Sequence, residues 1–204
     1  GLKTAVLLQF LINEKYQFDY LPVDISQNAL DRLKAKLSKT FPTLNIHTQR
    51  GEYFDILEKL NKTAEPKVIL VLGSNIGNLN DDLATQFLEK ISTHLHINDK
   101  LLLGVDVMKT ASIILPAYDD QQGVTSQFNL NLLVRINSEL KGNFNLNNFK
   151  HVAEYDENEG IAKSYLLSTI EQTVYVASIG KNFHFKKDEY ISTEISRKYS
   201  DAII

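Results

Sequence analysis

The chain has 204 residues, 43% of them hydrophobic and 23% charged, which is typical of one well-filled globular domain with or without a modest appendage. Its formal net charge is -3 and no basic stripe stands out, so nucleic-acid binding is not expected, and its apolar runs are too short to span a membrane. The absence of cysteine excludes disulfides, thiol nucleophiles and cysteine metal sites, and it fits a cytoplasmic location.

The first 140 residues alternate between helix-like and strand-like patterns. Helices are predicted over residues 4–15, 27–39, 53–60 and 81–95, the second of them capped by Ser26. Strands are predicted over residues 20–25, 44–48, 68–72 and 100–107. This alternation predicts a parallel sheet, and the continuous apolar strands indicate that both of its faces are covered. We therefore predict a doubly wound, Rossmann-like α/β core over residues 1–140, with ligands at the carboxyl ends of the strands.

Residues 141–204 have a different character. An Asn-rich turn region over residues 141–148 is followed by short segments that look like antiparallel strands joined by turns. These strands are predicted over residues 149–155, 161–168, 172–177 and 183–185. We expect a β-rich extension packed on the core rather than a separate domain. The pattern does not assign residues 116–123 or 125–133.

Asp24 and the run Gly51-Glu52-Tyr53 are candidate nucleotide contacts, because Asp24 lies at the end of one predicted strand and the run follows the next. In nucleotide-binding α/β folds, a carboxylate at a strand end accepts from both ribose hydroxyls, and capping the next helix is the alternative for Asp24. Gly51 would let the backbone approach a ligand closely, and Glu52 with Tyr53 would bind and stack on an adenine. A turn with a solvated glutamate is the alternative for this run.

The loop Leu72-Gly-Ser-Asn-Ile-Gly-Asn78 follows the most apolar strand, where a doubly wound fold places its site. Its glycines, Gly73 among them, and its polar side chains favour a functional role, although Asn78 could instead cap the next helix. Tyr118, in the polar run Ala117-Tyr-Asp-Asp120, is suited to orienting a substrate through its hydroxyl. A structured loop is the alternative there.

Glu194 and Ser196 lie two residues apart near the end of the chain, so they face the same way in an extended segment. A carboxylate and a hydroxyl on one side suit a ligand that carries a ring N–H or an ammonium, and surface decoration is the alternative. His94 and His96 have no evident third ligand, so we predict no metal site.

Seven stretches together resemble the histidine-specific methyltransferase family, whose members use S-adenosylmethionine. The family includes histidine Nα-methyltransferases of the ergothioneine pathway and is related to the ergot dimethylallyltryptophan N-methyltransferase. The stretches occur in the family's order and cover essentially the whole chain. They are Lys3-Thr4 and residues 20–26, 72–78, 103–106, 117–120, 123–131 and 193–196.

The resemblance implies a cofactor site for S-adenosylmethionine. Lys3 would lie beside the methionine part, Asp24 would hold the ribose, and Glu52 with Tyr53 would contact the adenine. Gly51 and Gly73 would lie in the loops that approach the cofactor. Glu52 and Tyr53 stand where the family usually has Asp-Phe.

The resemblance also implies a small amino-acid substrate that is methylated on its α-amino group. Asn78 and Tyr118 would bind the α-carboxylate, and Glu194 with Ser196 would bind the imidazole of histidine. Ser164 stands where the family has a methionine in a strand that lines the substrate pocket. Because an α-amino group has an ordinary pKa of about 8, positioning of the neutral amine would suffice, and we identify no general base.

The family places a first strand and a Gly-rich turn just before the Lys-Thr pair, and Gly1 to Thr4 resembles the end of that turn. We therefore expect the first strand and the loop to be absent from this chain. Rearranged strands or a partner chain in a homo-oligomer would then fill the gap in the sheet, because unpaired backbone groups are costly. A non-catalytic domain that keeps the fold and serves in binding or assembly is the second hypothesis.

Overall fold

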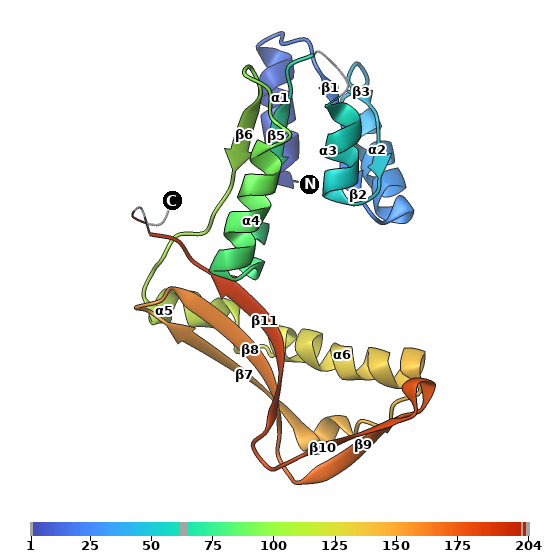
Figure 1. The fold of residues 1–204 in the computed structure, drawn as a ribbon, viewed down its shortest axis with the longest axis vertical. Helices are drawn as coiled ribbons and strands as arrows, with labels where there is room; N and C mark the ends of the chain where they lie inside the picture. The colour runs from blue at the N-terminus through green and yellow to red at the C-terminus, as the bar shows by residue number, and fades with distance from the viewer. Residues whose placement is uncertain (1, 62–64, 201, 203–204) are drawn as a thin grey trace. The chain divides into compact units, whose positions relative to one another are not determined.

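The computed structural model describes residues 2–61, 65–200 and 202 of this mixed α/β chain (Figure 1). The α-helices of this part are α1 (Leu2–Asn13), α2 (Gln27–Thr40), α3 (Tyr53–Leu60), α4 (Asp81–Ser92), α5 (Ala111–Ile114) and α6 (Val124–Leu140), and its 3-10 helices are η1 (Asn75–Asn78), η2 (Leu115–Ala117), η3 (Leu146–Asn148) and η4 (Ala177–Ile179). The strands are β1 (Asp19–Tyr20), β2 (Val23–Asp24), β3 (Asn45–Ile46), β4 (Gln49–Arg50), β5 (Val68–Val71), β6 (Lys100–Leu103), β7 (Phe149–Asp156), β8 (Ile161–Ser168), β9 (Gln172–Val176), β10 (Lys181–Phe185) and β11 (Tyr190–Arg197). The chain divides into a first unit, Gly1–Lys67 with Leu88–Asp99, and a second unit, Val68–Phe87 with Lys100–Ile204.

The first unit contains a parallel ladder in which β1 pairs with β3 and β2 pairs with β4. Pro22 has no N–H to donate, so the strand predicted over residues 20–25 is divided into β1 and β2 at this point. The side-chain amide of Gln49 donates to the carbonyl of His47 at 3.3 Å and so replaces the missing donor. Beyond the proline the ladder continues, since the N–H of Gly51 donates to the carbonyl of Asp24 at 3.2 Å.

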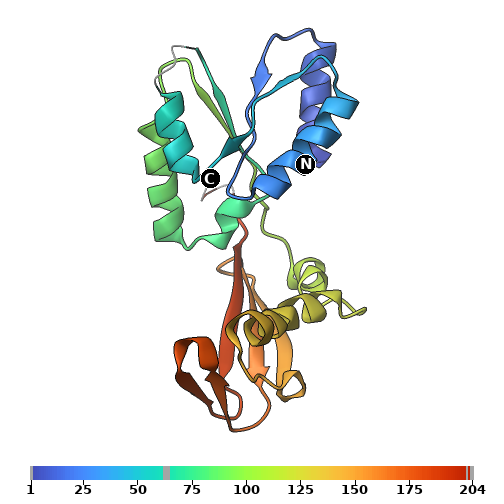
Figure 2. The same cartoon turned by 90° about the vertical axis from the view of Figure 1, so that its right-hand side faces the viewer.

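Helices α1 and α2 pack together in the first unit (Figure 2). As predicted, Ser26 caps α2, and its hydroxyl oxygen accepts from the N–H of Ala29 at 3.3 Å. The apolar faces of the two helices meet the ladder in one cluster, whose most buried members are Leu8, Leu37, Phe41 and Ile46. This cluster packs the parallel ladder against α1 and α2.

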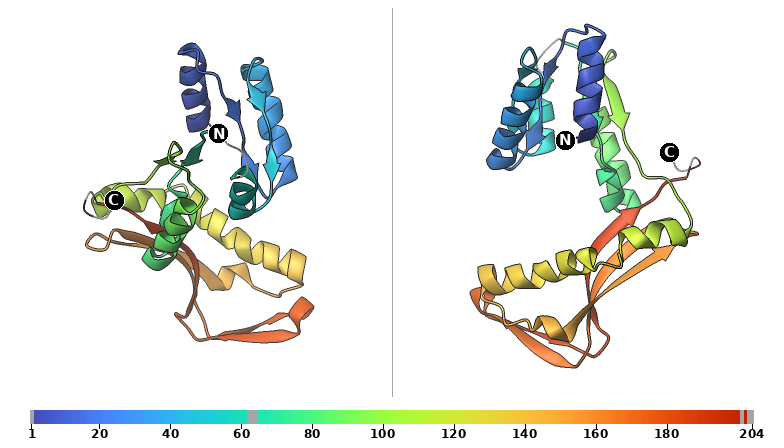
Figure 3. Two further views of the ribbon diagram at one scale, coloured as in Figure 1. Left: turned by 45° about the horizontal axis from the view of Figure 1, so that its top comes forward. Right: turned by 180° about the vertical axis from the view of Figure 1, so that it is seen from behind.

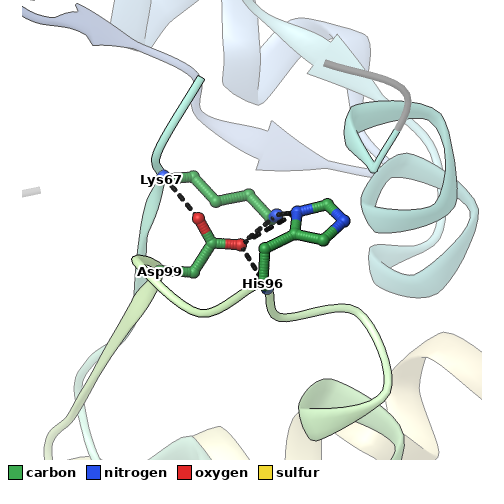
Figure 4. A network of polar contacts seen from close by, with 3 residues as sticks. All are labelled: Lys67, His96 and Asp99. Atoms are coloured by element: carbon green, nitrogen blue, oxygen red, sulfur yellow. Dashed lines mark hydrogen bonds and ion pairs between the residues drawn. The ribbon is translucent and has the colours of Figure 1, made fainter. Parts of the chain in front are cut away.

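Asp99 connects the residues that precede β5 and β6 (Figure 4). Its carboxylate, only 1% exposed, accepts from the backbone N–H groups of Lys67 and His96, each at 2.8 Å, and pairs with the Lys67 ammonium. The hydrogen bonds from His96 and Lys67 hold the pKa of Asp99 well below its usual range. His96 thus has a structural role in this buried cluster.

The second unit contains the parallel pair β5–β6, the antiparallel sheet β11-β8-β7 and the hairpin β9–β10. Helix α6 lies along the sheet and contacts β7 and β8 (Figure 3). The alternation of β8 explains this packing, because its even-numbered residues from Ala162 to Ser168 are all buried while its odd-numbered residues are half-buried. The core of the unit is a hydrophobic cluster formed by Leu133, Phe144, Phe149, Leu166, Val174, Val176 and Phe185.

Three differences from the sequence prediction concern the second unit. The strand predicted over residues 100–107 ends at Leu103, and Asp106 and Met108 instead exchange backbone hydrogen bonds with Tyr199 at 2.8 and 3.0 Å. Residues 125–133, which the sequence pattern left unassigned, belong to α6. Strand β11, which was not predicted, completes the sheet that the predicted strands β7 and β8 form. Of the segment Gly1 to Thr4, which was expected to resemble the end of a Gly-rich turn, the structure places residues 2–4 in the first turn of α1, and Gly1 lies outside the described residues. The absence of the first strand stays a prediction. The single doubly wound sheet and the division at residue 140 stay predictions.

Candidate functional site

A pocket of about 320 Å³ in the second unit brings together two of the predicted substrate contacts, Asn78 and Glu194. Its walls come from the last residue of η1 and from the middle of β11, namely Asn78, Ser192, Thr193, Glu194 and Ile195. The volume is at the lower end of the range of about 300–1,000 Å³ for small-molecule sites. A free amino acid is a ligand of that size class.

The loop after β5 places Asn78 beside β11 through two backbone features. Gly73 and Ser74 both adopt left-handed conformations, with φ values of 83° and 61°, which turn the chain into η1. Gly77 then packs directly against β11, because a Cβ added there would lie 2.6 Å from the carbonyl oxygen of Arg197. The Arg197 guanidinium also pairs with Asp81 at 3.1 Å, which fixes the start of α4 on the same strand.

Glu194 and Ser164 lie directly opposite each other in the antiparallel ladder between β11 and β8. Directly opposed residues point to the same face of a sheet, so their side chains are neighbours. Ser164 is fully buried, and its hydroxyl has no hydrogen-bond partner among the described residues. Ser196 follows Glu194 without an intervening bulge, so the expectation that the two share a face is confirmed.

Tyr118 and Ser196 are joined by a residue that sequence reasoning missed, Lys198. Its ammonium donates to the Tyr118 hydroxyl at 2.6 Å and to the Ser196 hydroxyl at 2.8 Å, and it lies 3.3 Å from the Asp106 carboxylate. Lys198 is only 3% exposed. Burial raises the pKa of Asp106, but the Lys109 and Lys198 ammonium groups outweigh it, so the pKa is lowered.

Backbone contacts fix both ends of this polar cluster. The ring Nε2 of His151 lies 2.8 Å from the carbonyl oxygen of Tyr118, which can only accept, so this nitrogen carries the hydrogen. The N–H of Lys198 donates to the carbonyl of Gly160 at 2.6 Å. A Cβ at Gly160 would lie 2.7 Å from the carbonyl oxygen of Lys198, so the hairpin turn can approach only because this residue is glycine.

The predicted cofactor residues, apart from Gly73, belong to the first unit. Asp24 ends β2, and its Oδ1 accepts from the N–H of Ser26 at 2.8 Å. The ladder sets Gly51 beside Asp24, and Glu52 and Tyr53 follow at the exposed start of α3. Lys3, the fifth member of this group, lies exposed in the first turn of α1.

Lys198 and Asp106 are the functional candidates that the sequence reasoning did not name. Lys198 continues the alternation of Glu194 and Ser196, which was the available signal. Over the residues that the structure describes, no cluster of three or more His, Cys, Asp or Glu residues could hold a metal, and no helix combines the length and apolarity needed to cross a membrane.

Comparison with known proteins adds a family and named relatives. The family model "Histidine-specific methyltransferase, SAM-dependent" matches residues 1–204. The chain is 32% identical over 197 residues to histidine N-alpha-methyltransferase of Mycolicibacterium smegmatis, an alignment covering 97% of this chain and 61% of that protein. It is 29% identical over 206 residues to ergothioneine biosynthesis protein 1 of Schizosaccharomyces pombe, covering 98% and 26%. An L-tryptophan methyltransferase of Psilocybe serbica is 27% identical over 196 residues, covering 90% and 54%. The chain thus spans about three fifths of the length of the bacterial relative.

Proposed function

Because the chain belongs to the histidine-specific, SAM-dependent methyltransferase family, we propose that its protein methylates the α-amino group of a free amino acid, histidine or a close analogue. The pocket that joins Asn78 to Glu194 is the observation that carries this proposal. It offers a carboxamide at one wall and a carboxylate at another, which suits a small ligand with a polar group at each end. The names of the relatives favour histidine first.

The cofactor in this proposal is S-adenosylmethionine, which supplies a methyl group on a positively charged sulfur. Asp24 fits the ribose, because Oδ1 holds the Ser26 N–H while Oδ2 has no partner among the described residues. Tyr53 is 55% exposed, which leaves its ring available to an adenine. The proposal includes the doubly wound sheet, since an acid at the end of a strand is where such folds bind ribose.

The substrate is held at both ends. Asn78 and the Tyr118 hydroxyl bind the α-carboxylate, and Glu194 and the Ser196 hydroxyl bind the side-chain ring. We assign Ser164, which is paired with Glu194 across the ladder, to the same end of the substrate. These contacts fix the orientation of the amine. Orientation supplies much of the rate when the neutral nitrogen attacks the methyl carbon in line with the carbon–sulfur bond that breaks. We assign no general base.

A methylation screen on the complete natural chain tests the proposal. The protein is incubated with labelled S-adenosylmethionine and single free amino acids, and product masses are recorded. We expect histidine to be methylated fastest and histamine, which lacks the α-carboxylate, to be at least about tenfold slower, because Asn78 and Tyr118 lose their partner. Equal rates for histidine and histamine would contradict the carboxylate assignment.

Calorimetry with S-adenosylmethionine separates the proposal from a non-catalytic domain. An enzyme of this family must bind the cofactor, whereas a binding or assembly module that only keeps the fold need not. Absence of both binding and turnover in the complete chain would favour the non-catalytic role.

A further inference from the structure

The buried ammonium of Lys198 contacts two of the four side chains assigned to substrate binding, yet the chemistry proposed above gives it no task. An ammonium has three N–H donors and no lone pair. Here its three partners are the Tyr118 hydroxyl, the Ser196 hydroxyl and the Asp106 carboxylate, at 2.6, 2.8 and 3.3 Å. Every N–H is therefore used within the protein.

This arrangement fixes the direction of two hydroxyl groups. An oxygen that accepts from an ammonium turns its own hydrogen away from that ammonium, because the like partial charges repel. Neither hydroxyl has another partner among the residues the structure describes. The hydrogens of Tyr118 and Ser196 are consequently free to be donated to a ligand.

We propose that Lys198 is a positioning residue that makes hydrogen-bond donors of the Tyr118 and Ser196 hydroxyls. In this way it selects the neutral form of the substrate ring. This inference rests on the proposed function. A donating Tyr118 matches a carboxylate. A donating Ser196 matches a ring nitrogen with a free lone pair, while Glu194, two residues away on the same face, accepts from a ring N–H. The pair therefore recognises a ring with one N–H and one bare nitrogen.

The positive charge of Lys198 also favours a neutral ring. A ring protonated on both nitrogens would direct an N–H at a hydroxyl that already faces an ammonium 2.8 Å away. An indole would bring a C–H to Ser196 and leave its hydrogen without an acceptor, which is costly in a buried site. Lys198 thus favours neutral imidazole over both imidazolium and indole.

The test compares histidine with a pyrrole analogue in which a C–H replaces the bare ring nitrogen. We expect the complete wild-type protein to prefer histidine by at least about tenfold in kcat/KM, the value of one hydrogen bond in a buried site. Lys198→Met removes the ammonium at nearly constant length, which frees Ser196 to rotate. The preference should then fall below about threefold, since the hydroxyl is no longer held as a donor.

Lys109→Met is the matched control. Lys109 also pairs with Asp106, at 2.8 Å, but it contacts neither Tyr118 nor Ser196. Its loss should leave the preference within about twofold of wild type, because both hydroxyls stay oriented. A folded Lys198→Met protein that keeps the full preference overturns the assignment of Lys198 while leaving the methyltransferase proposal intact. If the wild-type protein neither binds S-adenosylmethionine nor methylates histidine, both the methyltransferase proposal and the assignment of Lys198 are wrong.

A second measurement needs no variant. Histidine labelled with ¹⁵N in the ring is bound to the wild-type protein with S-adenosylhomocysteine at pH 7, and its ¹⁵N shifts are recorded. We expect one protonated and one bare ring nitrogen. A bound ring protonated on both nitrogens overturns the proposal even if the Lys198 variant does not fold.

Discussion

Two serines on β8 show how differently one side chain can be used. Ser164 and Ser168 are both fully buried on the same face of the strand. The Ser168 hydroxyl donates to the carbonyl of Ile170 at 2.8 Å and accepts from the amide of Gln172 at 2.6 Å. The Ser164 hydroxyl has no partner among the described residues, although it lies opposite Glu194. Its burial without a partner costs stability, which favours a role with a ligand.

We predict that Ser164→Ala leaves the free energy of unfolding unchanged or slightly raised, because an unpaired hydroxyl is replaced by a methyl group. The same variant should raise the KM for histidine, since the proposed function assigns Ser164, which is paired with Glu194 across the ladder, to the ring of the substrate. Ser168→Ala is the control and should lose about 1–3 kcal/mol, because it leaves buried partners unsatisfied. Urea unfolding and steady-state kinetics measure both effects. Loss of stability in Ser164→Ala would mean that its hydroxyl has a structural partner.

Sequence reasoning identified the residues with an evident chemical role but not the residue that orients them. Glu194 and Ser196 could be paired because their spacing alone places them on one face of a strand. Lys198 has the same spacing, but a lysine near a chain end usually extends into solvent. Instead its ammonium donates to the hydroxyl of Tyr118, which lies 80 positions earlier in the chain. A contact across that separation leaves no mark in local sequence.

At the scale of elements, the start of α6 is held by a side chain that precedes the helix. Gly123, the N-cap residue, has no side chain to accept a hydrogen bond. The carboxylate of Asp120 accepts instead from the N–H groups of Thr125 and Val124, at 2.7 and 3.0 Å. These hydrogen bonds lower the pKa of Asp120 to about 2. The cap adjoins Tyr118 and therefore also secures the substrate segment.

We predict that Asp120→Asn destabilises the protein at neutral pH, because a carboxamide offers one acceptor oxygen where the carboxylate offers two. A lowered pKa means that the stabilisation is complete above the ordinary value of about 4 and is lost as the pH falls toward about 2. The difference in urea midpoint between variant and wild type should therefore shrink over this window. Asp119→Asn, at an exposed neighbour, should have the wild-type midpoint throughout. A difference that does not change with pH would contradict the cap.

The elements themselves were predictable where local patterns dominate. Helix α3 begins and ends at the predicted residues, and α2 extends one residue beyond its predicted end. Pro22 lies inside the strand predicted over residues 20–25 and could have indicated a break there, but the apolar residues around it favoured one continuous strand. β11 was missed because Tyr190–Arg197 is a polar segment in which a bulge between Ser192 and Glu194 interrupts the period of two. Its strand character comes from pairing with β8.

At the scale of the whole molecule, the predicted cofactor residues other than Gly73 belong to the first unit and the predicted substrate residues to the second. A ligand that binds only the folded protein stabilises it, by about 2.7 kcal/mol at a concentration one hundred times Kd. For a chain of this size that corresponds to a rise in Tm of roughly 5–10 °C. We predict such a rise when S-adenosylhomocysteine is added to the complete protein.

The same measurement tests the assignment of Asp24. Asp24→Asn keeps an oxygen for the N–H of Ser26, which Oδ1 holds at 2.8 Å, so the fold should survive. The variant loses the charge and the second acceptor oxygen needed to bind two ribose hydroxyls, so the rise in Tm should largely disappear. Asp19→Asn, at the opposite end of the same ladder, should respond like wild type, because the partners of Asp19 among the described residues are Asn45 and His47 of the neighbouring chain segment. Equal shifts in all three proteins would place the ribose elsewhere, because a carboxylate that binds the ligand cannot be neutralised without weakening the complex.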